Sequence, residues 1–264
     1  MRKFYHYVIS ASSAKDRREF MRKQFENKGE EPNFLEAIMG KDISPEDWKK
    51  WVVPDELLTL KKGEVGGGLS HLQCYKNLLA SDKPYVFVFE DDSKITDEFF
   101  EAIDGICKYM DMQTDPVVLL LFNTFDTYVH KIGNIEKEIK VYRSLGGVLA
   151  AGYVINRKAA ANLVRINTPI FIQADAWRTF VKAGLIDLRC LNKKLVYGDD
   201  YLASHSIIEQ MESRNETSEA NKVAQKKRKK ALKYMYSKLT LSERLSALKS
   251  RALLHIRELY YDKN

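Results

Sequence analysis

Three consecutive acidic residues, Glu90, Asp91 and Asp92, offer the clearest chemistry in the sequence. They follow Tyr85–Phe89, an apolar run of aromatic and β-branched residues that predicts a buried parallel strand. Open α/β sheets bind their ligands at the carboxyl ends of such strands. Adjacent carboxylates repel one another, and a divalent cation that also holds a substrate's phosphates would offset that repulsion. A solvated acidic turn that merely ends the strand is the alternative interpretation.

The spacing of the three acids suggests different roles for them. If strand geometry continues, Glu90 and Asp92 share one face. We expect Asp92 to be the principal metal ligand, with Glu90 or Asp91 assisting directly or through water. Asp91 would otherwise bind hydroxyls of a ribose or a sugar.

A glycine-rich run, Gly63–Gly68, precedes an apolar-periodic helix that contains His71. Such a turn can hold phosphate on free backbone N–H groups. It has neither the Walker lysine nor the strand context of a dinucleotide-binding fingerprint, so the run by itself is weak evidence. His71 is either a contact to phosphate or donor, or a structural histidine.

Strand-like and helix-like segments alternate over the first 212 residues. This alternation predicts an α/β domain with a mixed sheet. We expect strands near residues 5–10, 33–39, 85–89, 116–122, 153–155, 186–191 and 195–197. We expect helices near residues 15–28, 43–51, 69–80, 97–110 and 157–166, another opening at 169–177, and a loop or hairpin at 123–138.

Composition limits the class of protein. The chain has 264 residues, of which 45% are hydrophobic, as is typical of a globular protein with a core. No stretch has the pattern of a signal peptide or the length to span a bilayer. Cys74, Cys107 and Cys190 are far apart, without metal-ligand spacing, which favours reduced thiols and a cytoplasmic protein.

The positive charge is concentrated in a C-terminal tail. Residues 213–264 hold 14 Lys/Arg and 5 Asp/Glu, a net charge of +9, so the chain's total of +7 leaves residues 1–212 at −2. Five bases occupy Lys226–Lys230, and leucines follow at helical spacing. Thr240 and Glu243 have the spacing of a capping box. We therefore predict a main domain at 1–212 and a basic amphipathic helical tail at 213–264.

Four motifs, in this order and spacing, resemble glycosyltransferase family 25, which includes bacterial lipooligosaccharide galactosyltransferases. The resemblance covers most of residues 1–210. It rests on the opening strand 7–10 followed by Asp16-Arg17-Arg18, on Gly63-Glu64-Val65-Gly66 with Leu69-Ser70-His71, on Phe89-Glu90-Asp91-Asp92, and on the run 151–158.

The resemblance implies a GT-A type nucleotide-sugar-binding fold with a central mixed, mostly parallel sheet. It also implies transfer with inversion, Mn²⁺ or Mg²⁺, and UDP-galactose as the donor. Asp175 is our candidate general base, by analogy with the placement of the base in inverting GT-A enzymes. A helix-end acid stabilised by the dipole is the alternative, and Asp199 or Asp200 would be the substitute base.

The remaining predicted contacts also follow from the resemblance. His205 is a candidate additional metal ligand beside Glu90 and Asp92. Arg17 or Arg18 would bind diphosphate or uridine, or else form a helix-surface salt bridge. The candidate donor-binding residues are Ile9, Ser10, Arg17, Arg18, Glu64, Gly66, His71 and Asp91.

The implied acceptor is a lipid-linked core sugar of lipooligosaccharide or lipopolysaccharide. The basic tail would then bind an anionic membrane, on the cytoplasmic face of a Gram-negative inner membrane. Packing of the tail on its own domain or on a second subunit of a homo-oligomer is the alternative. The near-neutral main domain argues against nucleic acid binding. UDP-glucose or a UDP-N-acetylhexosamine could replace UDP-galactose, and a metal-dependent phosphoesterase is the alternative from another class.

Overall fold

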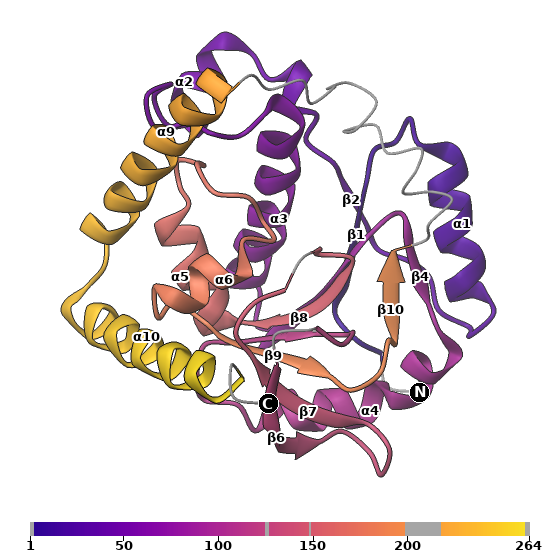
Figure 1. The fold of residues 1–264 in the computed structure, drawn as a ribbon. Helices are drawn as coiled ribbons and strands as arrows, with labels where there is room; N and C mark the ends of the chain where they lie inside the picture. The colour runs from indigo at the N-terminus through magenta and orange to yellow at the C-terminus, as the bar shows by residue number, and fades with distance from the viewer. Residues whose placement is uncertain (1–2, 125–126, 148, 199–217, 262–264) are drawn as a thin grey trace.

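A large sheet with helices on both faces forms the body of the molecule (Figure 1). The computed structural model describes residues 3–124, 127–147, 149–198 and 218–261. Eight strands are ordered β2-β1-β3-β8-β5-β9-β7-β6. Their bounds are β1 His6–Ser10, β2 Phe34–Glu36, β3 Tyr85–Glu90, β5 Val117–Leu120, β6 Thr127–Asn134, β7 Lys140–Ser144, β8 Gly152–Asn156 and β9 Asp187–Leu191.

The sheet is mixed, as the sequence predicted, but parallel pairs are not in the majority. Within the described residues, β1 pairs in parallel with β2 and β3, and β5 with β9. The other four pairings, β3 with β8, β5 with β8, β6 with β7 and β7 with β9, are antiparallel. The region 123–138, expected to be a loop or a hairpin, contains β6, which forms an antiparallel pair with β7.

Strand β3 lies between β1 and β8 and supplies side chains to both faces of the sheet. Val86 and Val88 belong to one hydrophobic core, while Tyr85, Phe87 and Phe89 belong to the other. This is the two-residue alternation of a strand that is covered on both faces. The prediction of a buried strand ending in acids is confirmed, with one parallel neighbour and one antiparallel neighbour.

Helices cover the two faces of the sheet as separate layers. Side chains of α1 and α4 join one core, and those of α3, α5 and α6 join the other. The helices of the main body are α1 Lys15–Glu26, α2 Pro45–Trp51, α3 Lys62–Ala80, α4 Asp97–Asp111, α5 Arg157–Ile166 and α6 Trp177–Lys182, with a short 3₁₀ turn η1 at Gly40–Asp42. Strands β4 (Ser93–Ile95) and β10 (Val196–Gly198) form a small antiparallel pair beside the acids.

Helix α3 corrects the prediction of a glycine-rich turn. It begins at Lys62, seven residues before the expected start, so Gly63–Gly68 lie inside the helix. Packing explains the glycine at position 66, because an added β-carbon there would come within 2.3 Å of the Ile38 carbonyl oxygen. Glycine is needed here so that the 38–40 segment can approach the helix, and the turn-type phosphate cradle is absent.

Two helices, α9 (Ser218–Ser237) and α10 (Leu241–Tyr261), form the described part of the basic tail along one side of the molecule (Figure 1). Helix α9 buries Ala231 and Met235 in the same core as α3 and α5. The predicted capping box is confirmed, since the Thr240 hydroxyl accepts from the Glu243 N–H while the Glu243 carboxylate accepts from the Thr240 N–H. None of the described helices is long and apolar enough to cross a membrane.

Candidate functional site

A cavity of about 420 Å³ opens where β1 and β3 end, beside helix α3. It is the position at which α/β sheets bind ligands. Residues predicted from widely separated motifs meet in its wall. The predicted site residues that line it are Ile9, Ser10, Arg17, His71, Glu90, Asp91 and Asp92.

Asp91 is fixed at the base of this cavity by neighbours from β1 and α1. Its carboxylate accepts from Ser10 Oγ at 2.7 Å and from Arg17 Nη1 at 2.8 Å. Both oxygens thus have donors, and the residue is only 9% exposed. Asp91 therefore ties the ends of β1 and β3 together, and the arginine offsets its charge.

The negative charge of Asp92 is offset less well than that of Asp91. Arg17 Nη1 lies 3.4 Å from its Oδ2. Burial, followed by repulsion from Glu90, raises the pKa of Asp92 to about 6, against the opposing effect of Arg17. The cavity edge therefore carries negative charge that the nearby arginine only partly offsets.

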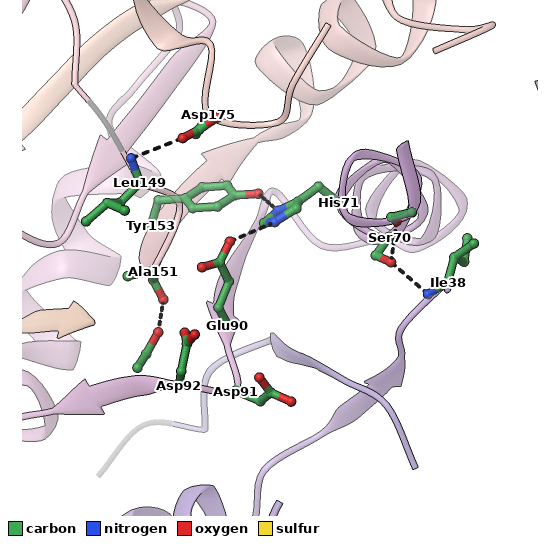
Figure 2. A network of polar contacts seen from close by, with 12 residues as sticks. Ile38, Ser70, His71, Glu90, Asp91, Asp92, Leu149, Ala151, Tyr153 and Asp175 are labelled. Carbon is green, nitrogen blue, oxygen red and sulfur yellow. Dashed lines mark hydrogen bonds and ion pairs between the residues drawn. The ribbon is translucent and has the colours of Figure 1, made fainter. Parts of the chain in front are cut away.

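Glu90 faces His71 of α3, the first member of a chain of polar side chains (Figure 2). His71 Nε2 lies 3.3 Å from Glu90 Oε1, and His71 Nδ1 lies 2.7 Å from the Tyr153 hydroxyl. Tyr153 contacts the Tyr75 hydroxyl at 2.7 Å. Burial raises the pKa of both tyrosines, so they remain protonated donors. This chain holds the imidazole in one orientation against Glu90.

Tyr153 and Tyr75 were missed in the sequence. Tyr153 lies in β8, where it was counted only as part of a strand motif, and Tyr75 lies on the apolar side of α3. Tyrosine at a core position gives no local signal of a polar contact. Their pairing depends on β8 lying beside β3 under α3, which only the tertiary structure determines.

The acids at 90–92 could supply only some of the ligands of a divalent cation. The described part of the chain contains no group of three or more His, Cys, Asp or Glu side chains arranged to hold a metal. Strand β3 ends at Glu90, so the strand geometry expected to align Glu90 with Asp92 does not continue. However, Mg²⁺ at nucleotide sites typically takes one or two carboxylates and completes its shell with phosphate oxygens and water. Glu90 and Asp92, with their surplus negative charge, match that donor set.

Three predicted donor contacts lie outside the cavity wall. Arg18 bonds the Ser10 carbonyl at 2.8 Å and Glu36 at 2.7 Å, and so connects α1 to β1 and β2. Glu64 accepts from the Lys61 N–H at 2.8 Å and from Gln173 Nε2, and so it caps the N-terminus of α3. Gly66 is required for packing. His205, Asp199 and Asp200 lie outside the described residues.

Asp175 lies on the far side of Tyr153 from the acid triplet and does not line the cavity (Figure 2). It precedes α6 instead of lying within a helix that opens at 169. Its Oδ2 accepts from the Leu149 N–H at 3.2 Å, and Trp177 Nε1 donates to the Leu149 carbonyl at 2.9 Å. Burial, and then repulsion from Glu90, raises the pKa of Asp175.

Leu149 itself is unusual in two ways. Its φ of 76° lies in the left-handed region, which a branched side chain rarely adopts. Its side chain is nevertheless 56% exposed. Asp175 and Trp177 together hold this strained residue in place, and such strain is common near functional sites.

The fold and the cavity together define an α/β protein with a carboxylate-edged ligand site at the strand ends. The model of glycosyltransferase family 25, described as an LPS biosynthesis protein family, matches residues 4–177. The chain belongs to this family. The match includes every predicted residue that lines the cavity, as well as Asp175.

Two curated relatives from Haemophilus influenzae agree with this placement. The lipooligosaccharide biosynthesis protein lic2B is 29% identical over 167 residues, which cover 60% of this chain and 61% of lic2B. A protein of strain Rd named as a candidate glycosyltransferase is 25% identical over 179 residues, which cover 65% of this chain and 61% of that protein. The matched part therefore spans about three fifths of each relative.

Proposed function

We propose that this protein is an inverting glycosyltransferase that moves a hexose, galactose from UDP-galactose, onto a core sugar of lipooligosaccharide or lipopolysaccharide. The observation that carries the proposal is the cavity at the ends of β1 and β3, with acids on one wall and family membership across all its elements. Its volume of about 420 Å³ lies in the range of small-molecule sites.

The cavity has groups suited to the diphosphate of a nucleotide sugar. Lys41 and Lys62 line it and supply positive charge for a diphosphate. Glu90 and Asp92 are the side chains that would hold Mn²⁺ or Mg²⁺ against the phosphate oxygens. When bound, that ion would neutralise the charge that develops on the departing UDP.

The proposed reaction is a single displacement. The acceptor hydroxyl oxygen bonds to the anomeric carbon as the bond from that carbon to the UDP oxygen breaks, and the hydroxyl proton passes to a carboxylate base. We assign the base to Asp175 because of the resemblance to inverting GT-A enzymes. Its side chain lies beyond Tyr153, outside the cavity wall, and burial raises its pKa. A positioned base of this kind contributes roughly 10²–10⁴-fold in rate.

The acceptor assignment is supported by the role in lipooligosaccharide biosynthesis that the name of the relative lic2B gives, and by the geometry of the tail. Leu241, Leu245 and Leu248 lie on one side of α10 and are 76%, 60% and 60% exposed. Arg244 and Lys249 are exposed beside them. An exposed leucine row bordered by bases suits the surface of an anionic membrane, where a lipid-linked acceptor would be found. We therefore propose a peripheral enzyme on the cytoplasmic face of the inner membrane.

A donor screen tests the proposed activity. Purified protein is incubated with UDP-galactose, UDP-glucose or UDP-N-acetylglucosamine, with Mn²⁺ or with EDTA, and with truncated lipooligosaccharide as acceptor. We expect release of free UDP to require acceptor and metal and to be fastest with UDP-galactose. Equal release without acceptor would indicate hydrolysis, and faster release from another donor would reassign the sugar.

A further inference from the structure

The buried tyrosine Tyr153 connects helix α3 with the acidic end of strand β3. It is completely buried, and its ring packs edge-on against Trp177 with 5.2 Å between the ring centroids. It pairs in register with Val88 of β3, and Glu90 lies two residues further along that strand. Residues in register, and residues two apart in one strand, point to the same face of a sheet. Tyr153 and Glu90 therefore lie on the face that α3 covers.

The Tyr153 hydroxyl has two hydrogen-bond partners, which together limit where the protons can lie. It is 2.7 Å from His71 Nδ1 and 2.7 Å from the Tyr75 hydroxyl. If Nδ1 carried a proton, that proton would point at Tyr153, and one of the two phenol protons would have no acceptor among the described residues. Both tyrosines are buried, so an unpaired phenol proton would be costly. The arrangement that satisfies every proton runs from Tyr75 to Tyr153 and from Tyr153 to Nδ1.

This arrangement places the proton of the imidazole on Nε2, because a neutral histidine has one donor nitrogen and one acceptor nitrogen. Nε2 lies 3.3 Å from Glu90 Oε1 and can donate to that oxygen. The Glu90 side chain is itself 37% exposed and lines the cavity. One oxygen of Glu90 is thus held by His71 while the carboxylate stays open to a ligand (Figure 2).

We propose that Tyr153 is a positioning residue of the donor site, which fixes His71 as an Nε2–H donor and through it holds Glu90 toward the ligand. The proposal rests on the proposed function, in which Glu90 helps to hold Mn²⁺ or Mg²⁺ beside the diphosphate of the donor. It adds a residue that does not line the cavity and acts through two others. Loss of an outer partner of this kind typically lowers metal affinity by about 10–100-fold.

The first measurement is the position of the proton on His71, and it needs no ligand. Nitrogen NMR of protein labelled in histidine with ¹⁵N distinguishes protonated from unprotonated ring nitrogens, and His71→Asn assigns the signals by their disappearance. We expect Nε2 to be protonated and Nδ1 to be unprotonated in the wild-type protein. The Nδ1 signal should shift in Tyr153→Phe, which removes its donor, and should move little in Tyr75→Phe.

The second measurement compares these two variants in metal-dependent binding. Calorimetry measures UDP binding over a Mn²⁺ titration, and melting temperature reports whether each variant folds. Tyr153→Phe should need about 10–100-fold more Mn²⁺ than the wild-type protein for half-maximal UDP binding. Tyr75→Phe is the matched control, because it removes one buried hydroxyl from the same chain but leaves Tyr153 able to donate to His71. A merely structural role of the hydroxyls would affect both variants alike.

The outcomes separate this proposal from the proposed function. A proton on Nδ1 of His71 in the wild-type protein would overturn the proposal whether or not UDP binds, and this result does not depend on the folding of any variant. If the wild-type protein binds UDP with Mn²⁺ and the two variants need the same Mn²⁺ within twofold, the proposal alone is overturned. If the wild-type protein binds no UDP with Mn²⁺, the proposed function fails and the role of Tyr153 at the donor site fails with it.

Discussion

The acids at 90–92 are adjacent in sequence but have different surroundings. Asp91 accepts two hydrogen bonds from Ser10 and Arg17, whereas Glu90 contacts His71. Asp92 lies 3.4 Å from Arg17, whose closer contact is to Asp91, and its pKa is raised. The three carboxylates are therefore not interchangeable, and substitutions at each should have separable effects.

The first prediction concerns the charge of Asp92. Asp92→Asn keeps the shape but removes the charge proposed to hold the metal, so we expect at least a hundredfold loss of UDP release with little change in melting temperature. The measurement is UDP release over a Mn²⁺ titration after EDTA treatment. Asp55→Asn, at an exposed turn, is the control. If Asp92→Asn kept the turnover of the wild-type protein over the whole Mn²⁺ titration, the metal role would be contradicted.

The second prediction concerns Asp175. Asp175→Asn retains a hydrogen-bond acceptor for the Leu149 N–H but cannot accept a proton, so kcat should fall roughly 10²–10⁴-fold while UDP affinity is kept. Near-normal kcat would move the base role to another carboxylate, with Glu90, which lines the cavity, tested next.

The pH dependence follows from the same residue. A base acts only when deprotonated, and burial and Glu90 raise the pKa of Asp175 above that of an ordinary aspartate. Activity should therefore rise with pH through this elevated pKa, which places the acid limb of the kcat profile above the range of an exposed aspartate. A kcat profile measured from pH 4 to 8 checks this, and an acid limb at the ordinary aspartate pKa would count against Asp175.

At the scale of elements, α9 belongs to the core as well as to the basic tail. Ala231, Met235 and Leu239 are buried with residues of α3 and α5, and Tyr234 packs on Phe171. Arg165 of α5 also pairs with Glu243 of α10. The division at 212/213 remains a prediction, but removal of the whole tail would expose core surface, so point substitutions are the better test of its role.

The third prediction follows from this packing. Met235 is completely buried, so Met235→Ala should lower the free energy of unfolding by about 2–5 kcal/mol through lost contacts and a cavity. Urea-induced unfolding measures the change. Lys233→Ala, on the exposed side of the same helix, should change it by less than about 0.5 kcal/mol. Equal effects of the two substitutions would mean that α9 does not pack on the domain.

At the scale of the whole molecule, one set of apolar side chains in the tail is buried and another set is exposed to solvent. Its buried side chains complete the protein's core, while the leucines of α10 point away from it. Packing of the tail on its own domain thus describes α9 well, but it does not account for the exposed Leu241, Leu245 and Leu248. These leucines are where membrane binding should be tested.

The fourth prediction is that the full chain floats with phosphatidylglycerol vesicles at low salt and does not float with neutral phosphatidylcholine vesicles. Replacing Leu241, Leu245 and Leu248 together by serine should abolish flotation without unfolding the protein, because all three are exposed. Met112→Ser, at an apolar residue that is 70% exposed at the end of α4, is the control. Flotation of the triple variant at the wild-type level would rule out this surface as an anchor.

The sequence by itself was sufficient for the features that depend on local pattern. The apolar run before Glu90 predicted β3, the spacing of Thr240 and Glu243 predicted a capping box, and four ordered motifs predicted the family. These signals succeed because alternation, capping and motif order are properties of neighbouring residues.

Only the tertiary structure decided which of the predicted residues face the cavity. Gly66 and Gly67 are adjacent and chemically identical, yet one lies against backbone and the other against open space. Asp175, Arg18 and Glu64 carry charges typical of a site but lie outside the cavity wall, while Tyr153, with no local signal, orients His71 from an adjacent strand. Such roles depend on strand order and helix packing across long sequence separations, and no local window of sequence contains that information.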